Sequence, residues 1–172
     1  AAIIASETGT GKTDMAAAVC RRVTKGAERA LCVLVTTDAA QAKKLGSAFG
    51  STYLNGFHFG NAMGTRKALA ETGRVHVTMT ARYFKEHLLG LDEEGEALGE
   101  YEELLVKPTA PTEIVFVLDE VEAYCKDGWH GRLKRMRKKS SVPVSFLGLS
   151  ATAGANAHAY FDIFGQAPER FA

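Results

Sequence analysis

The sequence predicts an α/β fold built around a mostly parallel β-sheet. Three short apolar, β-branched runs indicate the sheet: LCVLV at 31–35, IVFVL at 114–118 and VSFLGL at 144–149. Strands that are apolar on both faces belong in parallel sheets covered by helices. Segments with helical periodicity separate the runs, and this alternation is typical of βαβ units in a doubly wound sheet. The third observation is a glycine-rich turn, GTGKT at 9–13, between an apolar segment and a helical pattern.

The remaining elements rest on shorter patterns. AIIA at 2–5 leads into the glycine-rich turn and is a strand candidate, as are VHVTM at 75–79 and TYL at 52–54. Apolar residues that recur with a period near 3.6 define the connecting helices. The predicted helices are 14–23, 39–49, 65–71, 81–89, 131–138 and 155–164.

Length, charge and cysteine content limit the class of protein. A chain of 172 residues is long enough for one domain with its own core. A formal net charge of +1 gives no overall attraction to a polyanion, so local contacts would have to bind a nucleic acid. The three cysteines lack redox or metal-site spacing, and we expect them to be reduced and buried. Neither a membrane span nor a targeting signal is visible, so we expect an intracellular protein with no membrane partner.

Two charged segments have ordinary structural explanations. DEEGEALGEYEE at 92–103 is acidic and interrupted by glycine, which predicts a solvated insertion. RLKRMRKK at 132–139 is basic, but Leu133 and Met136 are three residues apart. We expect these two side chains to face the core of the protein and the cations to form the solvated side of a helix.

The segment SETGTGKT, from Ser6 to Thr13, is close to a phosphate-binding loop. The P-loop pattern places glycine where this chain has Ser6, but it retains the later glycines and the lysine. Such a loop binds phosphate through backbone N–H groups at a helix N-terminus. Lys12 would contact the β and γ phosphates of ATP, and the Thr13 hydroxyl would bind Mg²⁺. The predicted nucleotide-binding residues are Ser6, Glu7, Thr8, Gly9, Thr10, Gly11, Lys12, Thr13 and Asp14.

The segment IVFVLDE supplies the acids that a P-loop enzyme needs. Asp119 and Glu120 follow an apolar strand directly, and α/β folds bind their ligands at the carboxyl ends of strands. Asp119 would hold Mg²⁺ together with Thr13. Glu120 would polarise the attacking water, so Lys12 and Glu120 are the predicted catalytic residues.

Three segments together resemble the superfamily 2 helicases and translocases. ASETGTGKT, VLDEVE and LSATA match motifs I, II and III of that family in their order and separation. The family commonly has alanine, serine or glycine at the first loop position, which accommodates Ser6. Motif II usually reads D-E-A-D or D-E-x-H, whereas this chain has Glu122 at the fourth place. The resemblance implies a P-loop NTPase with a RecA-like three-layer fold over residues 1–172. It also implies a second RecA-like domain, supplied by the rest of the protein.

The resemblance assigns further roles by position. LVTTDAAQAKKL resembles motif Ia and VTMTARYF resembles motif Ib, which implies that the chain binds the phosphate backbone of DNA or RNA. Hydroxyl groups and helix N-termini suit such contacts without many lysines. The implied nucleic-acid contacts are Thr36, Thr37, Thr78, Thr80 and Arg82. The residues implied to couple the nucleotide state to these contacts are Glu122, Ser150, Ala151 and Thr152.

Two other functions remain open from the sequence. A viral-type DNA-packaging ATPase, similar to a terminase, also combines a P-loop, an acidic strand end and a coupling serine or threonine. A nucleotide-dependent interaction module without motor activity is suggested by Glu122 and by the acidic segment at 92–103. The leading hypothesis is the ATP-binding and hydrolysing half of a helicase or translocase, with ATP and Mg²⁺ as cofactors.

Overall fold

The computed structural model describes residues 2–5, 9, 11–50, 62–89, 100–125, 129–151 and 169–171. Within these ranges the chain forms a six-stranded sheet in the order β3-β2-β4-β5-β1-β6. Every pair of neighbouring strands is parallel. The strands are β1 (Ala2–Ala5), β2 (Ala30–Thr36), β3 (Arg74–Thr80), β4 (Glu113–Leu118), β5 (Val144–Ser150) and β6 (Glu169–Phe171).

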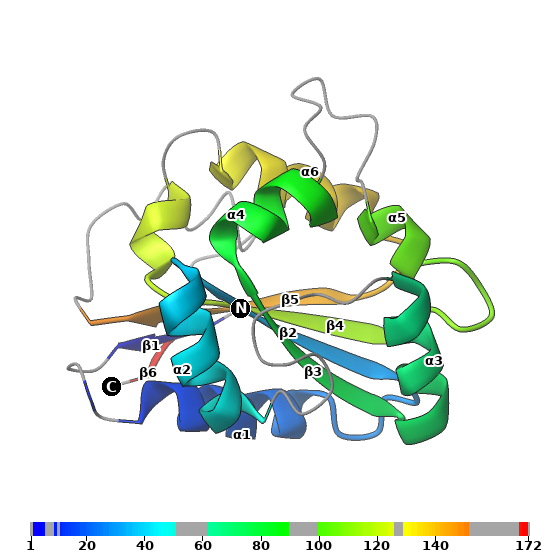
Figure 1. Ribbon diagram of the computed structural model, residues 1–172, viewed down its shortest axis with the longest axis horizontal. Coiled ribbons are helices and arrows are strands. Elements are labelled where there is room, and N and C mark those ends of the chain that lie inside the picture. Colours follow the sequence, from blue (N-terminus) through cyan, green and yellow to red (C-terminus); the bar gives the residue numbers. More distant parts are fainter. Residues whose placement is uncertain are drawn as a thin grey trace.

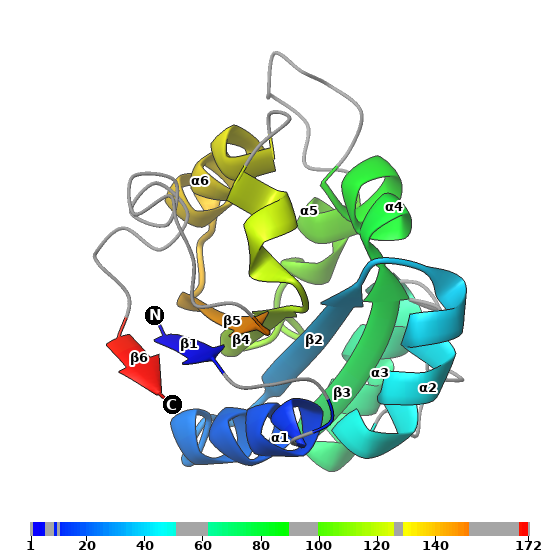
Figure 2. The same cartoon turned by 90° about the vertical axis from the view of Figure 1, so that its left-hand side faces the viewer.

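Helices cover both faces of the sheet, so the described part of the chain has three layers (Figure 1). One face carries α1 (Lys12–Val23) and α2 (Ala39–Phe49), and the opposite face carries the later helices, as the second view also shows (Figure 2). At the edge of the sheet, α3 (Ala62–Thr72) packs beside the edge strand β3 and contributes to the larger core. The opposite face consists of α4 (Ala81–Tyr83), the π-helical η1 (Phe84–Leu88), α5 (Glu100–Leu104), the 3-10 helix η2 (Val121–Cys125) and α6 (Trp129–Lys139).

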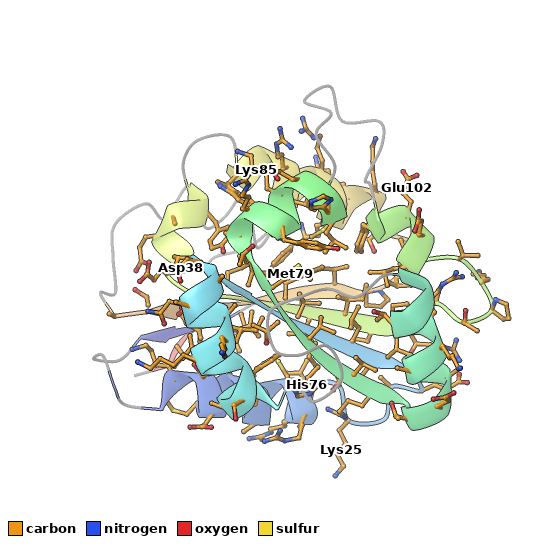
Figure 3. All side chains as sticks on the ribbon, in the orientation of Figure 1. Lys25, Asp38, His76, Met79, Lys85 and Glu102 are labelled. Carbon is orange, nitrogen blue, oxygen red and sulfur yellow. The ribbon has the colours of Figure 1, made fainter. Side chains whose placement is uncertain are left out.

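The uninterrupted apolar run of β2 is explained by its central position. Successive side chains of a strand point to opposite faces of the sheet. Leu31, Val33 and Val35 therefore enter the larger core under α4, α5 and α6, whereas Cys32 and Leu34 enter the smaller core under α1 and α2. A side-chain view shows the same separation in β3, where Met79 lies between the sheet and the upper helices (Figure 3).

Polar caps fix where two helices begin at the carboxyl edge of the sheet. The Asp38 side chain accepts a hydrogen bond of 2.9 Å from the backbone N–H of Gln41, which caps α2. The Thr80 hydroxyl accepts one of 3.1 Å from the N–H of Tyr83, which caps α4. α4 thus starts immediately after β3 ends, and α2 starts after two intervening residues.

The fold class predicted from the sequence is confirmed, and so are the strands at 2–5, 31–35, 75–79, 114–118 and 144–149. The edge strand β6 was missed, because its three residues are polar or aromatic and lack an apolar run. The candidate strand at 52–54 and the candidate helix at 155–164 lie outside the described residues.

The two charged segments give one correction and one confirmation. The acidic segment at 92–103 is not a solvated insertion throughout, because residues 100–103 belong to α5 and Tyr101 is fully buried. Burial raises the pKa of Tyr101 to about 12, and its hydroxyl lies 2.7 Å from the Ser140 hydroxyl oxygen. Leu133 and Met136 in the basic segment are buried as predicted.

Cys20 and Cys32 are buried free thiols, as the sequence predicts, whereas the side chain of Cys125 lies outside the described part. No helix in the described ranges is both long and apolar enough to cross a membrane.

Candidate nucleotide-binding site

The strand order brings the glycine-rich loop beside the acidic strand end. β1 lies next to β5, with Ala5 opposite Ser150, and β5 lies next to β4, with Leu118 opposite Gly148. All these strands are parallel, so the segments that follow them emerge at one edge of the sheet. The loop follows β1 and Asp119 follows β4, which places both at the edge where α/β folds bind ligands.

Two glycines of the loop adopt a backbone conformation that other residues rarely take. Gly9 and Gly11 have φ angles of 84° and 78°, in the left-handed region that favours glycine. α1 begins directly after Gly11, and no side-chain cap is found on its N-terminus among the described residues. The backbone N–H groups of its first turn therefore face the loop, where an anion can accept them. Ser6, Glu7, Thr8 and Thr10 lie outside the described residues.

A cavity of about 340 Å³ lies between the loop, α2 and the carboxyl edge of the sheet. Its size is within the usual range for small-ligand pockets. Lys12 and Thr13 line the cavity from the first turn of α1. The Thr13 side chain is 8% exposed and Lys12 is half-buried. The described lining residues are Gly9, Gly11, Lys12, Thr13, Asp14, Gln41, Lys44, Leu45, Ala48, Asp119, Glu120, Leu149 and Ala151.

The α2 side of this cavity was not predicted from the sequence. Gln41 and Lys44 lie on the same side of α2 and bring an amide and a second cation to the cavity wall. The available signal was the position of α2, which is separated by only two residues from the end of β2 at the same sheet edge.

Asp119 lies in an environment that suits a cation. Burial raises the pKa of its carboxyl above the usual value, and the neighbouring charge of Glu120 raises it further. The N–H of Glu120 and the charge of Lys12 act in the opposite direction. The backbone N–H of Asp119 donates a 2.9 Å hydrogen bond to the carbonyl of Val35, which fixes the strand end. A divalent cation beside Asp119 would offset the unfavourable burial of negative charge.

The donor set fits Mg²⁺ that is bound together with a nucleotide. The described residues contain no cluster of three or more histidine, cysteine or acidic side chains that could hold a metal alone. The Thr13 hydroxyl and the Asp119 carboxylate supply oxygen ligands, and phosphate and water would complete the shell, as is common for Mg²⁺.

Glu120 has an unusual backbone conformation. Its φ angle is 51°, and it is the only residue other than glycine with a positive φ in the described ranges. This left-handed conformation costs on the order of 1–2 kcal/mol for a residue with a Cβ atom. The side chain is exposed and lines the cavity. Strain of this kind is often found at functional sites, which supports a role for Glu120.

A direct contact links the segment at 119–122, which follows β4, to the end of β5. The Ser150 hydroxyl donates a hydrogen bond to the Glu122 carboxylate oxygen Oε1. Ser150 is 2% exposed, and Ala151 follows it at the cavity wall. Glu122, despite its unusual identity at this position, therefore contacts the segment LSATA. Thr152 lies outside the described residues.

The candidate nucleic-acid contacts divide into surface and buried residues. Thr37 and Arg82 are exposed, Arg82 pairs with Glu86 at 3.1 Å, and Thr80 caps α4 with a partly exposed side chain. Thr36 and Thr78 are fully buried. The Thr36 hydroxyl donates to the carbonyl of Asp38 at 3.2 Å. Because buried hydroxyls cannot reach a phosphate backbone in this conformation, we do not retain Thr36 and Thr78 as contacts.

A parallel sheet with this loop and acidic strand end is typical of P-loop NTPase domains with a RecA-like fold. The chain belongs to the family described as type III restriction enzyme, res subunit, whose model matches residues 1–154. This assignment confirms the resemblance to superfamily 2 helicases that motifs I to III indicate.

Similar solved structures support the fold. The Hef helicase domain of Pyrococcus furiosus has a TM-score of 0.61 at 15% identity, over 99% of this chain and 34% of that one. A hypothetical ATP-dependent RNA helicase from Sulfolobus tokodaii has a TM-score of 0.52 at 15% identity, over 98% of this chain and 46% of that one. The chain thus spans between a third and a half of these structures. A comparison with curated proteins gives no significant match.

Proposed function

We propose that this chain is the ATP-binding and hydrolysing half of a superfamily 2 nucleic-acid helicase or translocase. The observation that carries the proposal is one cavity lined by Lys12 and Thr13 from the loop and by Asp119 and Glu120 from the strand end. Phosphoryl transfer needs a phosphate cradle, a metal site and a group that orients water, and these four residues provide all three. The family match supports this class of ATPase.

Each residue has a distinct role in the proposed reaction. The Lys12 ammonium binds the β and γ phosphates, and Thr13 and Asp119 hold Mg²⁺, which neutralises charge on the phosphates. Glu120 orients the attacking water and accepts its proton. The hydrogen bond from Ser150 to Glu122 joins the end of β5 to the segment that carries Glu120. Through this contact the nucleotide state is coupled to the rest of the motor.

The proposal includes partners outside the described chain. The nucleotide lies between two RecA-like domains in this class of motor, so residues 1–172 form the first and the rest of the protein supplies the second. Thr37, Thr80 and Arg82 contact the phosphate backbone of DNA or RNA, which gives salt-sensitive binding without base specificity. The family match gives no support to a viral-type packaging ATPase or to an interaction module.

The test is ATP hydrolysis by the full-length protein and its Glu120→Gln variant, with and without single-stranded DNA or RNA. Glutamine keeps the shape of the side chain but cannot accept a proton, so turnover should be lost while ATP still binds. Lys12→Ala should instead weaken ATP binding itself, because the cation that faces the phosphates is removed.

Glu71→Gln is a matched control, because Glu71 is an exposed residue of α3 and does not line the cavity. Equal hydrolysis by the wild type and Glu120→Gln would refute the role of Glu120. Unchanged ATP affinity of Lys12→Ala by calorimetry would refute the phosphate-binding role of the loop.

A further inference from the structure

Gly148 in β5 lies unusually close to Val121 of η2. A Cβ atom at position 148 would lie 3.0 Å from both Cβ and Cγ2 of Val121, and 3.1 Å from its Cγ1. Carbon atoms in favourable contact are about 3.5–4.0 Å apart. Even one methyl group on β5 would therefore have to displace Val121 by a few tenths of an ångström.

Val121 has little freedom to move away. It is fully buried in the larger core, and its β-branched side chain is restricted in χ1. Tyr124, three residues later in η2, is also buried in that core and packs edge-on against Trp129, with ring centroids 5.0 Å apart. A methyl group at position 148 would therefore shift the backbone of residues 119–122, because no flexible side chain can move away in its place.

The segment that Val121 anchors carries the strained glutamate. Glu120 immediately precedes Val121 and has the φ angle of 51°. Glu122 immediately follows it and accepts the hydrogen bond from Ser150, which lies two residues beyond Gly148 on the same strand. β5 thus holds the chain at Val121 by close packing and at Glu122 by a hydrogen bond. Because Val121 directly follows Glu120, its close packing on β5 sets the direction in which the chain turns at Glu120.

We propose that Gly148 is a positioning residue for ATP hydrolysis: the missing side chain at this position allows Val121 to seat on β5 and aims the Glu120 carboxylate into the cavity. The inference rests on the proposed function. Lys12 and Thr13 belong to α1, a different element, so they keep their places when residues 119–122 shift. A methyl group at position 148 should consequently impair the chemical step more than nucleotide binding.

The experiment is a double-mutant cycle in the full-length protein with Gly148→Ala, Val121→Ala and both together. Gly148→Ala should lower kcat by about 3- to 10-fold, since a shift of a few tenths of an ångström costs less than the roughly 100-fold of a 1 Å misplacement. Its affinity for a non-hydrolysable ATP analogue should stay within about twofold, because that binding does not require the Glu120 carboxylate. Val121→Ala removes the contacts with Cγ1 and Cγ2 but leaves its Cβ 3.0 Å from the new Cβ, so the double variant should recover part of the kcat that Gly148→Ala loses.

Gly131→Ala is the matched control. Gly131 lies in α6, and a Cβ there meets nothing within 4 Å. This variant should keep the kcat and analogue affinity of the wild type, which separates an effect of crowding at position 148 from an effect of replacing any glycine.

Three results would overturn the inference. They are an unchanged kcat in Gly148→Ala, parallel losses of kcat and analogue affinity, and a double variant that remains as slow as Gly148→Ala. If Gly148→Ala does not fold, the double variant decides, because it must then fold and hydrolyse ATP above background. A wild-type protein that fails to hydrolyse ATP would instead refute the proposed function, and this is measured before any variant is made.

Discussion

The hydrogen bond from Ser150 to Glu122 should contribute measurably to stability. Ser150 is 2% exposed, so replacing it with alanine removes a buried donor without exposing a new surface. Hydrogen bonds to charged groups contribute about 1.5–3 kcal/mol. Glu122 is only half-buried and water can partly replace the lost donor, which favours the lower end of that range. We expect Ser150→Ala to reduce the free energy of unfolding by about 1.5 kcal/mol.

The assay is urea unfolding of the 172-residue chain, followed by circular dichroism. A loss of 1.5 kcal/mol corresponds to about 3–6 °C in Tm for a chain of this size, which thermal unfolding checks independently. A cycle with Glu122→Ala and the double variant isolates the pair, with an expected coupling of about 1 kcal/mol. Ser145→Ala is the matched control, because Ser145 lies in the same strand and is half-buried.

Activity distinguishes a coupling role from a purely structural one. In the full-length protein, Ser150→Ala should retain basal ATP hydrolysis but lose the link between hydrolysis and strand separation or movement. A change in unfolding free energy below about 0.5 kcal/mol would refute the hydrogen bond as a stabilising contact. Equal losses of both activities would refute the coupling role.

Three further predictions concern the segment that follows β4 and the isolated chain. At position 120, glycine should be more stable than alanine by about 1 kcal/mol in urea unfolding, because the φ angle of 51° disfavours any Cβ atom. Tyr124→Phe should leave the urea midpoint unchanged or raise it, since the Tyr124 hydroxyl is buried and has no hydrogen-bond partner in the described part of the chain. The isolated chain should hydrolyse ATP barely above background in steady-state assays. The second RecA-like domain of the proposed function would supply an arginine that stabilises charge on the transferring phosphoryl group, and such an arginine contributes about 10³ to 10⁵ in rate.

Each of these has a contradicting result. Equal stability of the glycine and alanine variants would mean that position 120 is not strained in solution. A clear loss of stability in Tyr124→Phe would show that the hydroxyl has a partner there. Robust turnover by the isolated chain, stimulated by nucleic acid and independent of protein concentration, would refute the need for a second domain.

The sequence predicts the sheet well because its strands are buried on both faces. Such strands need apolar residues at every position, and the runs at 31–35 and 114–118 show this without ambiguity. The short edge strand β6 lacks this signal, since it pairs on one side only and its identity depends on the register with β1. The helix α5 was hidden by the acidic residues around Tyr101, whose burial is decided by tertiary packing.

The site shows the same difference between local and long-range information. The loop at 9–13 and the pair Asp119 and Glu120 are local patterns with a known chemistry, so sequence alone brings them forward. The contribution of Lys44 and the close approach of Gly148 to Val121 depend on which elements meet in space. The burial of Thr36 also could not be predicted, because a threonine at a strand end can cap a helix, bind a ligand or turn inward.

The position of β1 in the sheet has a consequence for how the protein is made. Ala2 pairs with Leu147, so the strand that leads into the phosphate-binding loop finds its place only after nearly all of the described sheet has been synthesised. Contacts between residues so distant in sequence slow folding, because a long loop must close before they form. β2, β3 and β4 can assemble first, since each pairs with a strand nearer in sequence. During synthesis on the ribosome, the proposed nucleotide-binding site should therefore be completed last, when β1 enters beside β5.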